Sequence, residues 1–281
     1  MSSTPNERAS SVEPVESTTG SGPVDGLRTT QALPADGIPR PPDVVRRLAL
    51  LWDPPRPSGR GRKARHTLDD VVTAGIEVAD ADGLDALSMR KVAARLGVGA
   101  MSLYTYVPGR TELLDLMIDR VFAGLDLPRA GAPWRDGLTH YAREHWQLYL
   151  DHPWVLQTNM WRLPVTPHVL DAQEAGLRTI VDTGLSAAQV AEILNLVDAF
   201  VRGLARAAVA EATDGTASGS STDEYWTSMS SFWVDHFDPE RYPTMQRIWD
   251  QGGFDATTSP FDASIDRLLD AVETAIDRAA R

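Results

Sequence analysis

The stretch 88–110 limits the possible fold of this chain of 281 residues more narrowly than any other segment. Its apolar residues follow the i, i+3, i+4, i+7 spacing of a short helix: Met89, Val92, Ala93 and Leu96. Ser88 stands where a helix N-cap is expected, and Gly97 stands where a left-handed residue ends a helix. A second short helix is expected over 99–106. The pattern indicates a helix-turn-helix, whose second helix fits the DNA major groove, although any small helical hairpin shows similar spacing.

The distribution of charge bears on whether this segment binds DNA. The net charge of the whole chain is −12, which by itself argues against a nucleic-acid partner. Residues 56–110 nevertheless hold nine basic and six acidic side chains, whereas residues 111–281 hold thirteen basic and twenty-six acidic ones. Because an acidic body repels phosphate, it would orient the basic segment toward DNA. The charge pattern therefore favours DNA binding through the helix-turn-helix.

Composition and motifs exclude several other classes of protein. The chain has no cysteine, and hence no disulfide framework, thiolate nucleophile or cysteine metal site. It has no apolar run of about 18 residues, and its N-terminus lacks the profile of a signal peptide, so we expect a soluble, cytoplasmic protein without a membrane partner. The six histidines form no metalloprotease motif, and no nucleophile elbow or phosphate loop is present. We expect no catalytic residue, no metal site, no cofactor and no enzymatic activity.

Periodicity and punctuation along the chain predict an all-α fold in four regions. Residues 1–42 are rich in Ser, Thr, Pro and Gly and are expected to be disordered. A short helix and a basic arm occupy 43–65, the DNA-binding domain occupies 66–112, and a second helical domain occupies 113–281. Helices of that second domain are expected at about 134–151, 167–183, 186–212, 224–236, 239–251 and 260–280.

The basic arm precedes the DNA-binding domain directly. It contains no acidic residue and four candidates for contact with DNA: Arg60, Arg62, Lys63 and Arg65. A flexible arm of this kind lies along phosphates or enters the minor groove. A solvated linker is the alternative interpretation.

Two segments carry a resemblance to a known family. Residues 84–98, LDALSMRKVAARLGV, and residues 102–107, SLYTYV, resemble the DNA-binding domain of the TetR family of transcriptional regulators, over about 68–122. The branch with a tetracycline-repressor-like C-terminal domain is the most similar. The resemblance implies a three-helix DNA-binding domain followed by an all-helical ligand-binding and dimerisation domain. It also implies that the helix beginning at Arg110 links the two domains.

The resemblance assigns DNA contacts residue by residue. Ser88 and Arg90 would touch backbone or base edges, and Arg110 would hold a phosphate. Arg90 has the donors to bind guanine through two hydrogen bonds. The second helix contributes Ala100, Met101, Ser102, Tyr104, Thr105 and Tyr106. Ala100 and Met101 depart from the polar residues often found there, so apolar contacts to thymine methyl groups would replace hydrogen bonds; the alternative for each tyrosine is packing within the domain.

Aromatic residues suggest where a ligand binds. Seven of the eight tryptophans lie at or beyond Trp134, and apolar spaces between helices suit small, largely apolar molecules. The candidates are Met117, Tyr141, His145, Trp146, Tyr149, Trp154, Asn159, Met160, Trp161 and Phe200. Met117 would report occupancy to the linking helix. Ordinary core packing is the alternative for these side chains.

A single short recognition helix reads few base pairs, and the family reads palindromes as two-fold dimers. The expected interface uses the apolar stripes of helix 186–212 and of the final helix: Ile193, Val197, Phe200, Val201, Leu204, Leu268, Leu269 and Val272. The favoured function is a homodimeric repressor that binds a palindromic double-stranded DNA operator and is released by a small-molecule effector. A ligand-binding adaptor for a protein partner and a transcriptional activator on the same fold remain alternatives.

Overall fold

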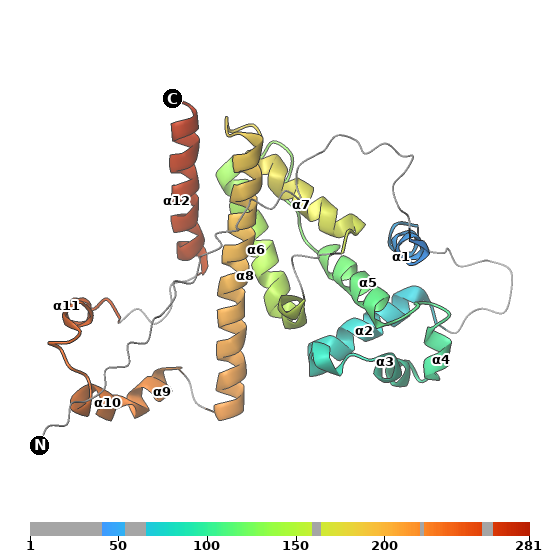
Figure 1. Cartoon of the computed structure of the whole chain (residues 1–281), viewed down its shortest axis with the longest axis horizontal. Coiled ribbons are helices and arrows are strands. Elements are labelled where there is room, and N and C mark those ends of the chain that lie inside the picture. Colours follow the sequence, from blue (N-terminus) through green and yellow to red (C-terminus); the bar gives the residue numbers. More distant parts are fainter. Residues whose placement is uncertain (1–40, 54–65, 159–163, 220–221, 255–260) are drawn as a thin grey trace, which may run out of the picture. The chain divides into compact units, whose positions relative to one another are not determined.

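The computed structural model describes residues 41–53, 66–158, 164–219, 222–254 and 261–281. In those ranges every regular element is a helix, so the predicted all-α fold is confirmed (Figure 1). Among the same residues no helix is both long and apolar enough to cross a bilayer. The basic-arm residues Arg60, Arg62, Lys63 and Arg65 fall outside the described ranges, as do residues 1–40 of the predicted tail.

Four helices build the DNA-binding domain: α2 (Leu68–Asp82), α3 (Met89–Leu96), α4 (Ala100–Leu103) and α5 (Arg110–Phe122), with the 3-10 turn η2 (Leu84–Ala86) between α2 and α3. Thr67 caps α2 in a reciprocal capping box with Asp70, and Ser88 caps α3 by accepting from the Lys91 amide. Gly97 ends α3 in the left-handed conformation at φ 67°, which glycine adopts without strain. The predicted boundary at 112 and 113 lies inside α5, so both domains share this helix.

The recognition helix is shorter than expected. The prediction of a helix over 99–106 is wrong beyond Leu103, because residues 104–106 form a turn. The Thr105 hydroxyl donates to the Ser102 carbonyl (2.7 Å), so this side chain takes an acceptor that a helix would use for a backbone amide. Pro108 also disfavours helical backbone at Val107.

The body contains α6 (Trp134–Asp151), η3 (Pro153–Gln157), α7 (Pro167–Ile180), α8 (Ala187–Ser218) and α12 (Phe261–Ala279). The bounds of α6 match the prediction, whereas α8 continues past 212 to the left-handed Gly219. Helices α6, α7 and α8 cross closely at Gly176, where an added Cβ would lie 2.6 Å from Leu194 Cδ1 and 2.9 Å from Tyr141 Cε2. Any larger residue at this crossing would force Leu194 or Tyr141 to shift.

Four shorter helices complete the described chain. Helix α1 (Pro42–Trp52) agrees with the helix expected at the start of region 43–65. The helices predicted at 224–236 and 239–251 are instead three shorter ones: α9 (Thr222–Ser228), α10 (Ser230–Asp235) and α11 (Pro243–Asp250). Neither α10 nor α11 contains a buried residue, so packing against the core does not lengthen them.

Candidate nucleic-acid interface and effector site

The helix-turn-helix presents most of the predicted DNA contacts on its surface. On α4 and the following turn, Met101 is 78% exposed and Tyr104 is 49% exposed, while Leu103 between them is buried in the domain core. Ser102 and Thr105 are exposed, and Ala100 is half-buried. Ser88 and Arg90 are exposed at the start of α3. These candidates thus lie at the start of α3, on α4 and on the turn that follows α4, a surface of the kind that usually contacts bases and phosphates.

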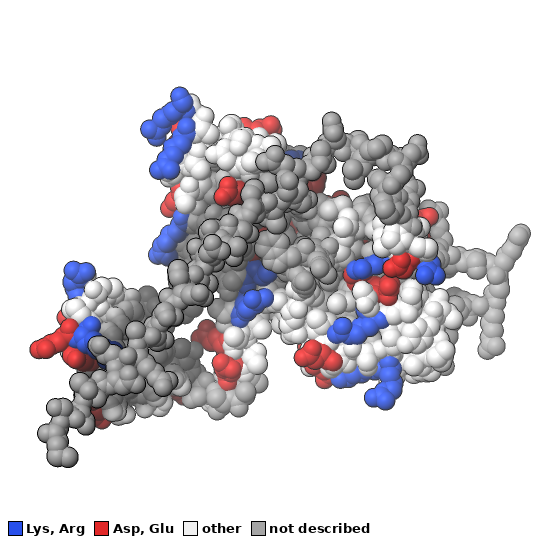
Figure 2. All heavy atoms as spheres, in the orientation of Figure 1, with Lys and Arg blue, Asp and Glu red and all other residues white. Residues whose placement is uncertain are grey.

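The basic residues of α3 differ in their availability. Lys91 pairs with Asp82 of α2 (2.8 Å), and Arg95 pairs with Glu77 of α2 (2.6 Å). Arg90 makes no ion pair to any described residue, and its side chain is exposed. Figure 2 shows basic side chains over the part of the molecule that holds α3 and α4 in Figure 1, with acidic side chains next to them. Of the basic residues of α3, Arg90 is therefore the one whose side chain is most available to bind a ligand.

Two predicted DNA contacts instead make hydrogen bonds within the domain. Arg110 donates from Nε to the Leu87 carbonyl (2.9 Å) and from Nη2 to the Leu84 carbonyl (2.8 Å). The Tyr106 hydroxyl donates to the His66 carbonyl (3.0 Å). These bonds join the ends of α4 and α5 to η2 and to the start of α2. Phosphate contact by Arg110 and Tyr106 stays a prediction, whereas their role in packing is directly visible.

A group of buried and half-buried polar side chains lies between α6 and α8, and we call it the polar cluster: Tyr141, His145, Tyr149, Asp198 and Arg202. The Tyr141 hydroxyl donates to Asp198 Oδ1 (3.0 Å), and the His145 ring lies 4.0 Å from the Tyr141 ring. The Arg202 guanidinium lies 5.9 Å from the centre of the Tyr149 ring. Its Nε is buried and has no hydrogen-bond partner among the described residues. A buried donor without a partner is a place where a ligand or water is expected to bind.

Burial shifts the titration of this cluster toward neutral side chains. It raises the pKa of Tyr141 well above 10.0, with Asp198 adding to the rise, and it raises the pKa of Tyr149 as well. Burial also raises the pKa of Asp198, and it lowers the pKa of His145. All four shifts have the same physical cause, because removing water disfavours the charged form of each group. The cluster therefore combines aromatic rings, hydrogen-bonding groups and the Arg202 guanidinium in a place where burial disfavours the charged forms of Tyr141, His145, Tyr149 and Asp198.

The lowered pKa of His145 predicts that the fold loses stability on acidification. The unfolded chain takes up a proton on this residue as the pH falls through the ordinary pKa of 6.5, before the folded chain does. Stability is thus full above that value and falls below it. We expect the wild-type melting temperature to fall between about pH 8 and about pH 5.5, and His145→Gln to reduce that fall. Parallel melting curves of the two proteins measure the difference; an identical fall in both would contradict the prediction.

The other ligand candidates lie in different surroundings. Trp154 is buried, but its Nε1 donates to Asp80 of α2 (2.7 Å), and Trp146 stacks on Phe261 of α12 at 4.6 Å. Met117 is buried in the DNA-binding domain, where its Sδ would lie 2.8 Å from a Cβ at position 75. Phe200 is half-buried against the core. Asn159, Met160 and Trp161 lie outside the described residues, so the structure joins only Tyr141, His145 and Tyr149 into one site.

The linking helix contacts the polar cluster through a different residue. Phe122, in the last turn of α5, meets the His145 ring edge to face at 5.8 Å. Sequence reasoning assigned this reporting role to Met117 and did not identify Phe122, Asp198 or Arg202. A signal was present for the last two, because Asp198 and Arg202 follow the buried Leu194 at i+4 and i+8 and so continue its edge of the helix.

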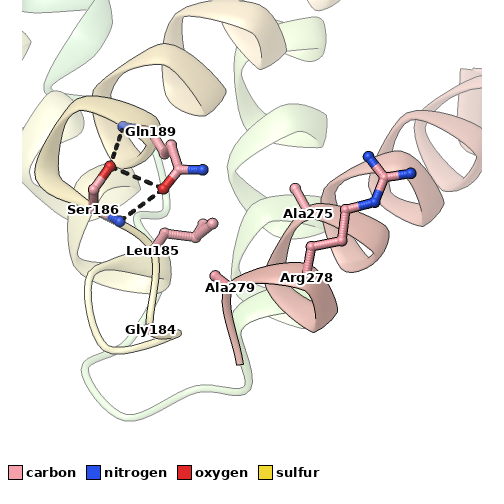
Figure 3. Close-up of a pocket in the computed structure, with 7 residues that line it drawn as sticks. All are labelled: Gly184, Leu185, Ser186, Gln189, Ala275, Arg278 and Ala279. Carbon is pink, nitrogen blue, oxygen red and sulfur yellow. Dashed lines mark hydrogen bonds between the residues drawn. The ribbon is translucent and has the colours of Figure 1, made fainter. Parts of the chain in front are cut away.

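A surface pocket of about 540 Å³ lies away from all these candidates, at the turn between α7 and α8 and the last turns of α12 (Figure 3). Its walls include Leu185, Ser186, Gln189 and Arg278. Ser186 and Gln189 cap α8 reciprocally, so their polar groups are already bonded to each other and to the backbone. None of the predicted ligand residues lines this pocket. In the described ranges no three His, Asp or Glu side chains are grouped so as to hold a metal ion.

Comparison with known proteins decides the family. A family model described as tetracyclin repressor-like, C-terminal domain matches residues 127–276, which is more than half of the chain. A second model, described as bacterial regulatory proteins, tetR family, matches residues 71–117. The chain belongs to the TetR family. The predicted branch of the TetR family is confirmed by the C-terminal match, and the chain is a transcriptional regulator.

Relatives and solved structures agree with this assignment. The HTH-type transcriptional repressor DrrR1 of Streptomyces coeruleorubidus is 38% identical over 236 residues, which cover 83% of this chain and 87% of the relative. An HTH-type transcriptional regulator of Saccharopolyspora erythraea is 36% identical over 50% of this chain and 59% of its own length. Apo ActR of Streptomyces coelicolor, a TetR-family protein also solved with actinorhodin, shares the fold with a TM-score of 0.61 at 23% identity, covering 78% of this chain and all of ActR.

Most of the predicted dimer residues lie inside the chain. Five of the eight are buried in the single chain: Ile193, Val197, Val201, Leu269 and Val272. Phe200, Leu204 and Leu268 are half-buried. The most apolar stripes of α8 and α12 pack inward because each helix first has to cover the core of its own chain. The face of α8 that remains exposed contains Leu196, Ala199, Gly203 and Ala207, spaced i, i+3, i+7 and i+11.

Proposed function

We propose that this TetR-family regulator is a homodimeric repressor that binds a palindromic DNA operator and is released by a small-molecule effector at the polar cluster. The observation that carries the proposal is the position of α5. This helix begins in the DNA-binding domain, held to η2 through Arg110, and ends with Phe122 against His145. A ligand that displaces His145 would therefore move the C-terminal end of α5, the helix whose N-terminal end belongs to the DNA-binding domain.

The cluster supports a particular effector chemistry. Its aromatic walls favour a flat, mostly apolar body, and the buried Nε of Arg202 favours an acceptor oxygen on the same molecule. A coupling of about 1–3 kcal/mol between effector and operator would lower operator affinity roughly 5- to 150-fold. Because effector and operator would both act through α5, release from DNA would need no enzymatic step. Binding to an operator would place the protein with the chromosome in the cytoplasm.

Dimerisation would use the exposed face of α8 together with α12, which packs beside it (Figure 1). The small residues Ala199, Gly203 and Ala207 would permit a close approach of two copies of α8. Two DNA-binding domains related by a two-fold axis match a palindromic site, and each domain contributes the exposed surface of α3 and α4.

The test is fluorescence anisotropy of the purified protein on duplex DNA from its own upstream region, with a scrambled duplex as control and across a salt series. We expect sequence-selective binding by two protomers, with an affinity that falls steeply as salt rises. An effector screen then follows tryptophan fluorescence and operator release together. Equal and weak binding to both duplexes would favour the adaptor alternative.

Arg90→Ala should weaken operator binding by about 1–3 kcal/mol and relax the preference at one base position, because Arg90 is exposed at the N-terminus of α3. Anisotropy on a set of single-base operator variants measures both effects. Arg95→Ala is the matched control, since Arg95 lies on the same helix and is paired with Glu77. A uniform loss across every operator variant would show that Arg90 contacts phosphate instead of a base.

A further inference from the structure

Helix α1 lies outside both segments matched by the family models, yet it is bonded to the DNA-binding domain. Arg47 donates from Nε to Asp115 Oδ2 (2.5 Å) and from Nη2 to Asp115 Oδ1 (2.8 Å), which is a two-pronged ion pair. Asp115 lies on α5 with a side chain only 7% exposed. Burial raises its pKa, and the bond from Arg47 opposes that rise. The carboxylate of α5 therefore depends on a cation that α1 supplies.

The other end of α1 is bonded to the body. Trp52 donates from Nε1 to the carbonyl oxygen of Val165 (2.8 Å), two residues before α7 begins at Pro167. Leu51, next to Trp52, is buried. Since Arg47 and Trp52 are five residues apart, the two anchors are separated by about 7.5 Å along the helix axis.

These bonds form a closed circuit with α5 and α7. Asp119 of α5 lies one turn beyond Asp115, on the same face of the helix. It accepts from the backbone amide of His168 (2.9 Å) and pairs with the His168 ring at Nδ1 (2.8 Å). Helix α5 is thus held twice near the start of α7: directly at Asp119 to His168, and through Asp115 and α1 to Val165.

We infer that α1 is a strap that limits how far the DNA-binding domain moves relative to the body. The two anchors act in series, because a strap that is released at either end restrains nothing. Releasing Arg47 leaves the Asp115 carboxylate, whose side chain is 7% exposed, without its cation, which is costly. The strap therefore adds to the direct bond at Asp119 in restraining the domain.

The test measures a distance between the domains and needs neither operator nor effector, so its outcome is independent of the proposed function. Because the chain has no cysteine, the pair Ala94→Cys on α3 and Glu174→Cys on α7 takes spin labels at those two exposed sites alone. Labelled protein is mixed with an excess of unlabelled chain, so that distances within one protomer dominate. Double electron–electron resonance is then expected to give one narrow distance for the strapped protein.

Two variants release the strap at opposite ends. Arg47→Met combined with Asp115→Asn removes the ion pair without leaving a buried unpaired charge. Trp52→Phe removes the indole donor, keeps an aromatic ring and lies at an exposed position that tolerates change. Each is expected to broaden the distance distribution, and all three substitutions together are expected to broaden it no further than either variant alone.

Arg46→Met is the matched control, because Arg46 is an exposed arginine on the same helix. It is expected to leave the narrow distance unchanged. Distances that stay narrow in both release variants would overturn the inference. Broadening that is additive in the combined variant would also overturn it, since that result means two independent local contacts and no strap.

Discussion

Replacing Leu196 with arginine is expected to lower operator affinity by about 10²- to 10⁴-fold, the range by which two linked binding modules exceed one. Leu196 is 49% exposed on the face of α8 proposed to meet a second copy. A charge buried there without a partner opposes dimerisation, and each monomer then reads only one half of the operator. Sedimentation velocity and operator anisotropy on the same samples measure the two consequences.

The matched control for that experiment is Leu170→Arg. Leu170 is an exposed leucine on α7, outside the proposed interface, so the same change of residue should leave the dimer and the operator affinity intact. Melting curves of both variants check that the protomer fold is preserved. A dimer that survives Leu196→Arg with unchanged affinity would place the interface on another face.

Trp154→Ala is expected to lower the free energy of unfolding by about 3–5 kcal/mol, the largest stability loss that we anticipate from one substitution. Trp154 is 1% exposed, and its indole N–H bonds to Asp80 of α2. The substitution opens a cavity beneath η3 and removes one of two partners of Asp80, the other being His152 (2.8 Å). Urea unfolding at a fixed protein concentration gives the free-energy change.

Two comparisons separate the contributions to that loss. Trp154→Phe keeps most of the ring and removes the donor, so it should cost only about 1–2 kcal/mol. Trp226→Ala makes the same truncation at a residue that is 52% exposed on α9 and should cost less than about 1 kcal/mol. Equal losses for the two alanine variants would mean that Trp154 does not stabilise the folded chain through burial.

The sequence predicted well those features that depend on residues close together in the chain. The cap at Ser88 and the left-handed Gly97 are as expected, because each depends on residues within one turn. The recognition helix was predicted too long, since the hydrogen bond from Thr105 to Ser102 and the effect of Pro108 together outweighed the apolar spacing.

Features that depend on packing between helices were predicted less well. An apolar stripe shows that a face is buried, but not whether its own chain or a partner buries it, and Val197 and Leu269 are buried by their own chain. The position of an aromatic residue in the sequence likewise does not show which residues it contacts in the fold. Tyr141 and Tyr149 meet at the polar cluster, whereas Trp146 stacks on α12 and Trp154 binds α2.

Besides apolar contacts, three carboxylates join α2 and α5 to the rest of the chain. Asp80, Asp115 and Asp119 each bond to a donor outside the DNA-binding domain: Trp154 and His152, Arg47, and His168 respectively. Water and dissolved ions compete for such bonds, whereas salt strengthens apolar contacts. Dissolved salt would thus weaken the more exposed of these bonds, between Asp119 and His168, as well as the proposed contacts with operator phosphate, so both effects would act in the same direction.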